Sequence, residues 1–218
     1  MVVGYQKTSD LPKVIPVFPL DGVLLLPHGT LPLNIFEPRY LNMIDDALAG
    51  ERAIGMIQTR PGGSRERPTL SKVGCLGRIT SFAETPDGRY LITLTGLCRF
   101  KVDQELLVQT PYRQVKADFS GFEDDLAPLA EDEGFDRIRF LAALKAYLDH
   151  RGLEIDWASA RDAPCEALVN SLAMALPFDA AEKQALLEAP GTIERREALI
   201  ALMEIDAAGD EDETPPLQ

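Results

Sequence analysis

Three short apolar runs, each interrupted by proline, stand near the start of the chain and constrain its fold more than any other feature. They cover residues 15–20, 22–27 and 33–40, and the last passes into a helical pattern at Pro38. Proline has no amide hydrogen, so a strand that contains it is confined to sheet edges, strand starts or bulges. The segment therefore predicts the bent opening of a small, irregular β-barrel, and it argues against a parallel-sheet nucleotide-binding fold.

The rest of the first half is expected to be mostly strands. The segment Thr85-Pro86-Asp87-Gly88 favours a tight turn and joins two of them into a hairpin. A helix interrupts the strands, because Pro38 suits a first helical position and apolar residues then recur at helical spacing up to Gly50. The expected strands cover residues 53–58, 73–84, 89–96, 97–102 and 107–119, with a polar loop at 59–69.

The second half changes to a helical period. Asp179 and Glu182 have the spacing of a capping box and predict the start of one helix. Helices are expected from about 138 to 152, 165 to 176, 179 to 190 and 192 to 206; Ile138 begins the apolar period of the first, and the inner face of the last is defined by Ile193, Arg196, Leu199, Ile200 and Met203. The predicted domains are a β-barrel at 12–118, an acidic linker at 119–134, a helical bundle at 135–206 and a disordered acidic tail at 207–218.

Charge is divided unevenly between the two halves. The chain of 218 residues has a net charge of −13, but residues 1–118 carry +2 and residues 119–218 carry −15. An acidic protein repels phosphate backbones, so nucleic acid is an improbable partner for the chain as a whole. There is no apolar run for a membrane span and no signal peptide, which predicts a cytoplasmic protein without membrane contact.

The residues that usually carry catalysis are sparse. There is no Gly-Lys pair for a P-loop and no Gly-x-Ser-x-Gly elbow, and His28 and His150 have no metal-ligand spacing. Paired acids such as Asp124-Asp125 are interpreted as solvated faces. We therefore expect no catalytic residues, no metal and no cofactor. The cysteines, which are far apart and odd in number, are interpreted as buried thiols: Cys75, Cys98 and Cys165.

Two groups of residues are candidates for binding. The first is a basic loop that could hold an anionic partner, an acidic peptide or a phosphate backbone, although a solvated hairpin tip is the alternative: Arg60, Arg65, Arg67 and Lys72. The second is a set of apolar side chains, some of which must fill the core while others could line an exposed peptide-binding groove: Phe18, Leu25, Leu33, Phe36 and Tyr40.

Several segments resemble the substrate-binding N-terminal domain of Lon proteases. Besides the proline-rich opening, residues 73–79 resemble that family's Val-Gly-x-x-(Gly/Ala)-x-Ile strand, and residues 95–100 resemble its Gly-x-x-Arg-Phe segment. The likeness extends over about residues 12–206, including an Asp-x-x-x-Lys-Gln pattern that starts at Asp179. It implies an α+β fold: a PUA-like irregular β-barrel with one inserted helix, followed by a C-terminal α-helical bundle.

The resemblance also marks residues of the family pattern, to which we assign structural roles. In Glu37-Pro38-Arg39-Tyr40, the acid and the arginine could pair to fix the helix against the barrel while the tyrosine packs. The other marked positions are Gly74, Gly96 and Arg99. The chain ends where the ATPase domain of a full Lon protease would begin, so neither the ATPase nor the Ser-Lys protease dyad is expected.

The resemblance implies a non-catalytic protein- or peptide-recognition module. Its expected partners are exposed apolar segments of unfolded or tagged polypeptides, bound by strand addition or in a groove, and a separate protease could be a second partner. Two alternatives stay open, an RNA-binding PUA-like module and a small enzyme with an unrecognised site. The sequence leaves the oligomeric state unknown.

Overall fold

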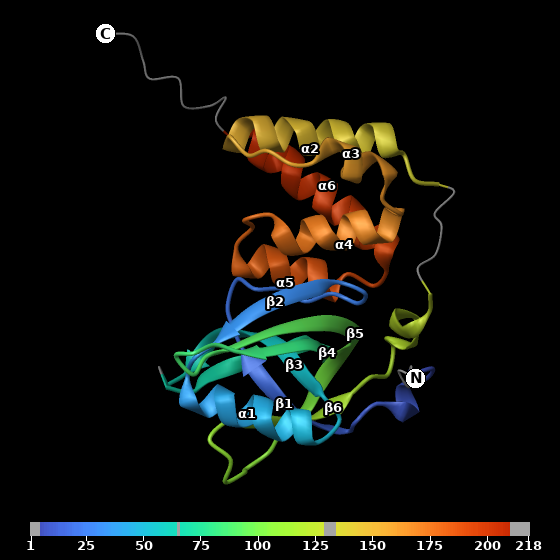
Figure 1. Cartoon of the computed structure of the whole chain (residues 1–218). Helices are drawn as coiled ribbons and strands as arrows, with labels where there is room; N and C mark the ends of the chain where they lie inside the picture. Colours follow the sequence, from blue (N-terminus) through green and yellow to red (C-terminus); the bar gives the residue numbers. More distant parts are fainter. Residues whose placement is uncertain (1–4, 65, 129–133, 210–218) are drawn as a thin grey trace.

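A closed β-sheet and a group of helices stacked against it form the chain, which confirms the predicted α+β architecture (Figure 1). The computed structural model describes residues 5–64, 66–128 and 134–209. The strands within them are β1 (Val14–Pro19), β2 (Thr30–Ile35), β3 (Ala53–Gly63), β4 (Pro68–Glu84), β5 (Tyr90–Glu105) and β6 (Arg113–Asp118). The α-helices are α1 (Pro38–Ala49), α2 (Arg137–Arg151), α3 (Trp157–Asp162), α4 (Cys165–Ala175), α5 (Ala180–Glu188) and α6 (Thr192–Ala208).

The long strand β5 closes the sheet because it has different neighbours at its two ends. The strand order is β2-β5-β4-β3-β1-β6, and β6 also pairs with β5. Residues 90–95 of β5 pair with β2, whereas residues 101–105 pair with β6. The ring therefore runs through β5, β4, β3, β1 and β6, and β2 is an edge strand on the outside of that ring.

The proline-rich opening forms strands in its first and third runs, as predicted. Pro16 and Pro19 lie in β1, and Pro32 lies in the edge strand β2, where a missing amide hydrogen is tolerated. The middle run, residues 22–27, has no regular structure, yet its three central leucines are buried. Gly96 allows this segment to approach β5, because a Cβ there would lie 2.0 Å from the Leu26 carbonyl oxygen.

Some predicted boundaries were wrong. The expected polar loop at 59–69 is largely strand, because β3 continues to Gly63 and β4 begins at Pro68. The expected strands 89–96 and 97–102 are one continuous strand, β5, and the expected strand 107–119 is shortened to β6. The short helix α3 was not predicted; Asp156 caps it by accepting hydrogen bonds from the amides of Ala158 and Ser159.

The helix ends follow local sequence signals. The capping box is confirmed: Asp179 accepts from the Glu182 amide, and Glu182 accepts from the Asp179 amide. The predicted inner face of α6 was partly wrong, since Ile193 is 55% exposed, and Ile138 of α2 is 85% exposed. Both lie in the first helical turn, at the edge of the bundle. Within the described part of the chain, no helix combines the length and the apolar content that a bilayer span requires.

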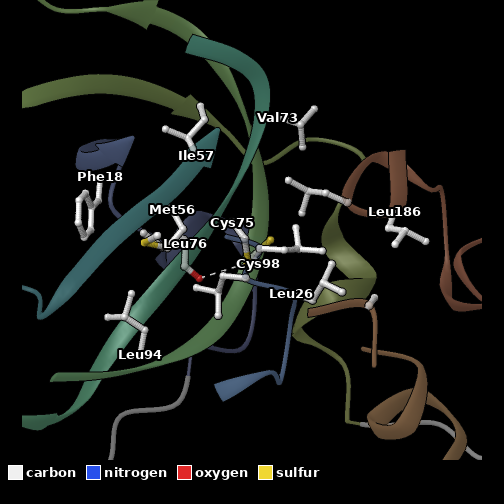
Figure 2. Close-up of a cluster of buried hydrophobic side chains, with 14 of the residues drawn as sticks. Phe18, Leu26, Met56, Ile57, Val73, Cys75, Leu76, Leu94, Cys98 and Leu186 are labelled. Atoms are coloured by element: carbon white, nitrogen blue, oxygen red, sulfur yellow. Dashed lines mark hydrogen bonds between the residues drawn. The ribbon is translucent and has the colours of Figure 1, made fainter. Parts of the chain in front are cut away.

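One hydrophobic core joins the barrel to the bundle. Figure 2 shows the barrel cluster around Met56 and Leu76 continuing toward Leu186 of α5. In Figure 1, α5 and α4 lie next to the barrel, whereas α1 lies on the side away from the bundle. The three cysteines are buried, as predicted, and none is in a disulfide among the described residues; burial raises the pKa of Cys98 to about 12.

Candidate functional site

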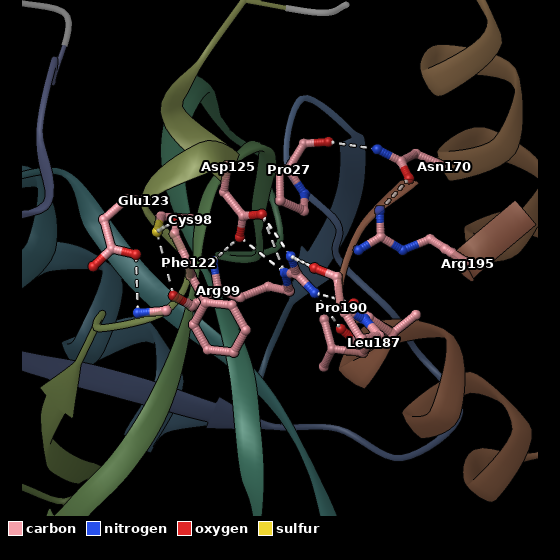
Figure 3. Close-up of polar contacts among 12 residues, drawn as sticks. Pro27, Cys98, Arg99, Phe122, Glu123, Asp125, Asn170, Leu187, Pro190 and Arg195 are labelled. Carbon is pink, nitrogen blue, oxygen red and sulfur yellow. Dashed lines mark hydrogen bonds and ion pairs between the residues drawn. The ribbon is translucent and has the colours of Figure 1, made fainter. Parts of the chain in front are cut away.

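A buried ion pair fixes the barrel to the bundle. The Arg99 guanidinium contacts the Asp125 carboxylate, with Nη2 2.8 Å from Oδ1 and Nε 2.9 Å from Oδ2 (Figure 3). The same guanidinium donates hydrogen bonds to the carbonyl oxygens of Leu187, Ala189 and Pro190. These carbonyls lie at the C-terminal end of α5, where a helix has unsatisfied acceptors and favours a cation. Arg99 therefore joins the barrel, the 3-10 helix that contains Asp125 and the end of α5.

The position of Asp125 corrects one prediction. The acids at 124 and 125 were expected to be solvated, but Asp125 is buried beside Arg99 while Asp124 is exposed. Asp125 lies in a short 3-10 helix, Glu123–Leu126, within the segment interpreted as a linker. Its carboxylate also accepts a hydrogen bond from the Arg99 amide. Because a buried guanidinium needs a counter-charge, this acid belongs to the core of the junction.

Further polar side chains cross the junction between barrel and bundle. Arg195 of α6 donates to Asn170 of α4, and Asn170 donates to the Pro27 carbonyl oxygen at 3.1 Å (Figure 3). Burial lowers the pKa of Arg195 to about 10, and its Nη2 has no hydrogen-bond partner among the described residues. Lys183 of α5 donates to the carbonyl oxygens of Gly22 and Met174, and burial lowers its pKa. The loop before β2 is thus held by both α4 and α5.

The family motif at the start of α1 combines an ion pair with an aromatic contact. Arg39 and Glu37 form an ion pair at 2.8 Å, and the Arg39 guanidinium lies 4.5 Å from the centre of the Tyr40 ring. Tyr40 is buried, and its ring packs against Phe18 at 4.3 Å between centroids. Pro38 occupies the first turn of the helix. The exposed charges therefore sit over an aromatic contact that attaches α1 to β1.

The two glycines of the family pattern permit close packing. A Cβ at position 74 would lie 2.6 Å from the Met56 carbonyl oxygen and equally close to the Phe100 ring, and Gly96 faces the Leu26 carbonyl as described above. Side chains at these two positions would collide with backbone, which explains why glycine occupies them.

The five apolar candidates divide into two groups. Phe18, Leu25 and Tyr40 are buried in the core, so their side chains do not line an exposed groove. Phe36 is 62% exposed just beyond β2, and Leu33 of β2 is half-buried. The edge strand β2 thus carries the candidates that could meet a partner.

Exposed apolar side chains of β4 and β5 lie beside that end of β2. Leu91 pairs with Asn34 of β2 and is 45% exposed, and Phe82 pairs with Ile92 and is 42% exposed. The Phe82 ring contacts the ring of Tyr90 at 4.9 Å between centroids. Leu91 was not predicted from the sequence, because its proximity to Phe36 depends on the pairing of β2 with β5. By register, Leu33 and Phe82 share the sheet face of Ile92, whereas Leu91 lies on the opposite face with Asn34. Phe36, two residues after Asn34, lies on the Leu91 side. We call the pair Phe36 and Leu91 the β2 patch.

A cavity lies at the opposite end of β2. It has a volume of about 350 Å³ and lies between the start of β2 and helix α4. His28 lines it from a turn with φ of +61°, in keeping with the predicted turn position. Its lining mixes apolar groups with a few polar ones, and it includes Thr30, Leu31, Pro32, Asn170, Ser171 and Met174. The strand therefore runs from a hollow at the junction to an apolar surface at the far end of the barrel.

The predicted basic loop is only partly gathered in space. Arg67 pairs with Glu105, whereas Arg60 and Lys72 are exposed and line the same hollow beside α5. Arg65 lies outside the described residues. Arg60 donates from Nε to the Leu70 carbonyl oxygen, which holds its side chain across the β3–β4 hairpin. Among the described residues, no group of three or more His, Cys, Asp or Glu side chains is placed to hold a metal ion.

Comparison with known proteins agrees with this architecture of a closed barrel, an inserted helix and a bundle that shares its core. Residues 14–204 match the family described as the ATP-dependent protease La (LON) substrate-binding domain. The chain belongs to that family, as its sequence resemblance implied.

Relatives and solved structures share this likeness. A Lon protease of Roseiflexus castenholzii is 30% identical over 112 residues, and one of Anaeromyxobacter dehalogenans is 33% identical over 119; each match covers about half of this chain and 14% of the relative. A Lon N-terminal domain protein from Xanthomonas campestris has a similar fold, with a TM-score of 0.62, 22% identity and coverage of 86% of this chain and 97% of that one. The N-terminal domain of a Mycobacterium avium complex Lon protease has a TM-score of 0.59 at 18% identity, over 91% and 100% of the two chains.

Proposed function

We propose that this domain recognises polypeptides by binding their exposed apolar segments along β2. The observation that carries the proposal is the β2 patch, in which Phe36 and Leu91 expose 62% and 45% of their surface in a domain of the Lon substrate-binding family. Apolar surface removed from water stabilises a complex by about 25 cal/mol per Å². Apolar groups gathered on one surface are typical of protein-binding sites.

Side-chain insertion suits this surface better than strand addition. Pro32 lies in the middle of β2, opposite Thr93 of β5. A proline in an edge strand directs its missing N–H toward the free edge, so an added strand would meet a gap in the hydrogen-bond ladder. The second mechanism considered from the sequence, apolar side chains entering a groove, is therefore the one we propose.

The ends of β2 define the length of segment that the surface could hold. The cavity of about 350 Å³ includes Thr30, and Phe36 follows the last strand residue, Ile35. A strand rises roughly 3.3 Å per residue, so the two features are on the order of 20 Å apart. An extended segment of about six residues spans that distance. We propose that one apolar side chain enters the cavity while another packs on the β2 patch.

The test is titration with an unfolded, cysteine-blocked, apolar-rich polypeptide, followed by amide hydrogen exchange. Binding along β2 predicts protection of residues 30–36 and 90–95, and Phe36→Ser should weaken binding. Ile138→Ser is the matched control, because Ile138 is also exposed but lies on α2 of the bundle. Protection confined to the bundle, or an equal effect of the two substitutions, would contradict the proposal.

Because the curated relatives are Lon proteases, we also propose a protease as the destination of a bound segment. Its test is the rate at which a purified Lon protease degrades the same polypeptide with and without this chain. An unchanged rate would remove this part of the proposal and leave the binding function intact.

A further inference from the structure

We infer that a second surface, the groove between the β3–β4 hairpin and α5, binds an extended acidic segment of a polypeptide. This inference rests on the proposed function in one respect, since the occupant is again a polypeptide. It adds a separate place and a separate chemistry: a carboxylate-bearing segment held by cations, on a different part of the barrel from the β2 patch.

A large bulge in β4 shapes this groove. The β3–β4 register pairs Ile57 with Gly74 and Thr59 with Leu70. Gln58 therefore stands alone opposite three residues of β4, which are Ser71, Lys72 and Val73. Bulges bend a strand and redirect its side chains, and they are common near binding sites. Within this bulge Ser71 is buried, whereas Lys72 is exposed and lines the groove.

Side-chain amides hold α5 against the bulge, so the groove has fixed walls. Gln184 of α5 donates from Nε2 to the Val73 carbonyl oxygen at 3.1 Å. Gln58 donates from Nε2 to the Ala180 carbonyl oxygen at 3.0 Å and to Gln184 Oε1 at 3.1 Å. These bonds link the residue opposite the bulge, the bulge itself and the first turn of the helix. A preformed groove orders little on binding, which favours affinity.

The groove has room for a bound segment. It consists of two adjoining hollows of about 590 and 540 Å³, which share Arg60, Ser71, Lys72 and Glu188. Small side chains on α5, Ala181 and Ala185, leave room along one wall. Apolar side chains from the barrel contribute to the lining of the first hollow: Leu70, Val73 and Val102.

Charge identifies the occupant. Arg60, Lys72 and Lys101 all line the first hollow, and Lys72 makes no hydrogen bond or ion pair with the described residues. Of the two acids there, Glu105 pairs with Arg113 and Arg67, whereas Glu188 accepts a hydrogen bond from the neutral Gln184 and keeps its charge. Three cations therefore face one acid that is not in an ion pair, so the lining is net positive in a protein whose net charge is −13. Complementary charge favours carboxylates and steers them to the groove.

A polypeptide fits this lining better than a nucleic acid does. Among the described residues that line the two hollows there is no aromatic ring on which a base could stack. A lining that combines cations with apolar side chains matches instead a segment in which acidic and apolar residues alternate, since an extended chain directs its acids to one side and its apolar residues to the other.

The experiment uses the full chain and a fluorescent ten-residue peptide of alternating glutamate and leucine. Glutamine–leucine and lysine–leucine peptides of the same length serve as ligand controls. We expect the acidic peptide to bind best, and its affinity to fall with salt. Lys72→Glu should raise its Kd about fivefold or more, because an attraction becomes a repulsion. The matched variant Lys13→Glu makes the same charge change at an exposed barrel position outside the groove, and it should leave Kd near the wild-type value.

Each outcome separates this inference from the proposed function. Equal weakening by Lys72→Glu and Lys13→Glu would show a general charge effect and overturn the groove. If the protein does not bind the acidic peptide, but the unfolded apolar polypeptide still protects the β2 amides from exchange, the groove inference is wrong and the proposed function stands. If a single-stranded RNA decamer binds with an affinity that falls with salt, and the acidic peptide does not bind, the proposed polypeptide occupant is wrong. Binding of the acidic peptide that survives Phe36→Ser but not Lys72→Glu supports two separate surfaces.

Discussion

The two ends of β2 meet very different surroundings. Beyond the start of β2, at the junction with the bundle, charged side chains are buried and hydrogen-bonded, as Arg99 is to Asp125 and to three carbonyl oxygens. At the far end, large apolar side chains such as Phe36 are exposed to solvent. A folded chain normally arranges these groups the other way round, with apolar side chains buried and charges in water.

This contrast separates groups that maintain the fold from groups available to a partner. Buried charges are tolerated only where partners offset their lost hydration, so substitutions at the junction should reduce stability. Exposed apolar groups contribute little to folding, so substitutions at the β2 patch should change binding and leave stability nearly unchanged. Each substitution below tests one side of this difference.

The largest effect is expected at the junction. Asp125→Ala leaves the Arg99 guanidinium buried without its counter-charge, and it should lower the free energy of unfolding by about 3–5 kcal/mol. Urea denaturation measures the change. Asp124→Ala removes the exposed neighbour and should stay within about 0.5 kcal/mol. Equal losses for the two variants would mean that the ion pair is not what stabilises the junction.

The next effect concerns the close approach of backbone segments near the start of β2. Gly96→Ala places a methyl group 2.0 Å from the Leu26 carbonyl oxygen, so the loop before β2 must shift. We expect a loss of about 1–3 kcal/mol by the same measurement. Gly50→Ala is the control, because a Cβ there has its nearest contact at 3.5 Å. A wild-type stability for Gly96→Ala would show that this loop is not held in place.

A smaller effect is expected where α1 contacts the barrel through Asp46. Tyr112 donates a 2.6 Å hydrogen bond to Asp46, and burial together with this bond raises the tyrosine pKa to about 12. Because the pKa of Tyr112 in the folded protein lies above the ordinary value of 10, the protonated tyrosine stabilises the fold. This stabilisation is complete below about pH 10 and is lost as pH rises toward 12.

Tyr112→Phe should therefore cost about 1 kcal/mol at neutral pH and flatten the loss of stability between about pH 10 and 12. Thermal or urea unfolding across that range measures it. Tyr90→Phe is the comparison, since Tyr90 makes a longer bond of 3.0 Å to the neighbouring Asp45 at the surface. If the stability of Tyr112→Phe falls between about pH 10 and 12 as steeply as that of the wild type, other groups cause the loss.

The smallest effect on stability is expected at the β2 patch. Phe36→Ser should change the free energy of unfolding by no more than about 0.5 kcal/mol, because the ring is already mostly in water. The same variant should raise the Kd for the unfolded polypeptide about fivefold, as expected for losing roughly 1 kcal/mol of apolar contact. If Phe36→Ser loses much stability and binds as the wild type does, Phe36 stabilises the fold and does not contact the polypeptide.

Local signals predicted much of this fold, because the interactions involved span few residues. Pro38 and Gly50 bound the first helix, and the capping box at Asp179 and Glu182 sets the start of α5. The continuity of β5 could not be read in this way, because one half of the strand pairs with β2 and the other with β6. Composition alone therefore predicted two strands where there is one. The polar residues of 59–69 likewise predicted a loop where β3 ends and β4 begins.

The candidate sites depend on contacts between distant residues, so the sequence indicated them only partly. Leu25 and Phe36 are equally apolar, and the closure of the barrel is what buries one and exposes the other. Asp125 looks like its exposed neighbour until Arg99, 26 residues earlier, is found beside it. Likewise Lys72 was noticed for its charge, while the bulge that places it in a groove results from an irregular register with β3.

The arrangement around Arg99 has a consequence for the order in which the chain is made. Its carboxylate partner follows it by 26 residues, whereas the carbonyls that it caps on α5 follow it by 88 to 91. During synthesis the barrel can therefore form its ion pair before α5 has emerged, and water can solvate the guanidinium edge that α5 later covers. The helix then arrives at a cation already in place for its C-terminal end. One side chain of the barrel thus provides the binding site for the C-terminal end of a helix that is synthesised much later.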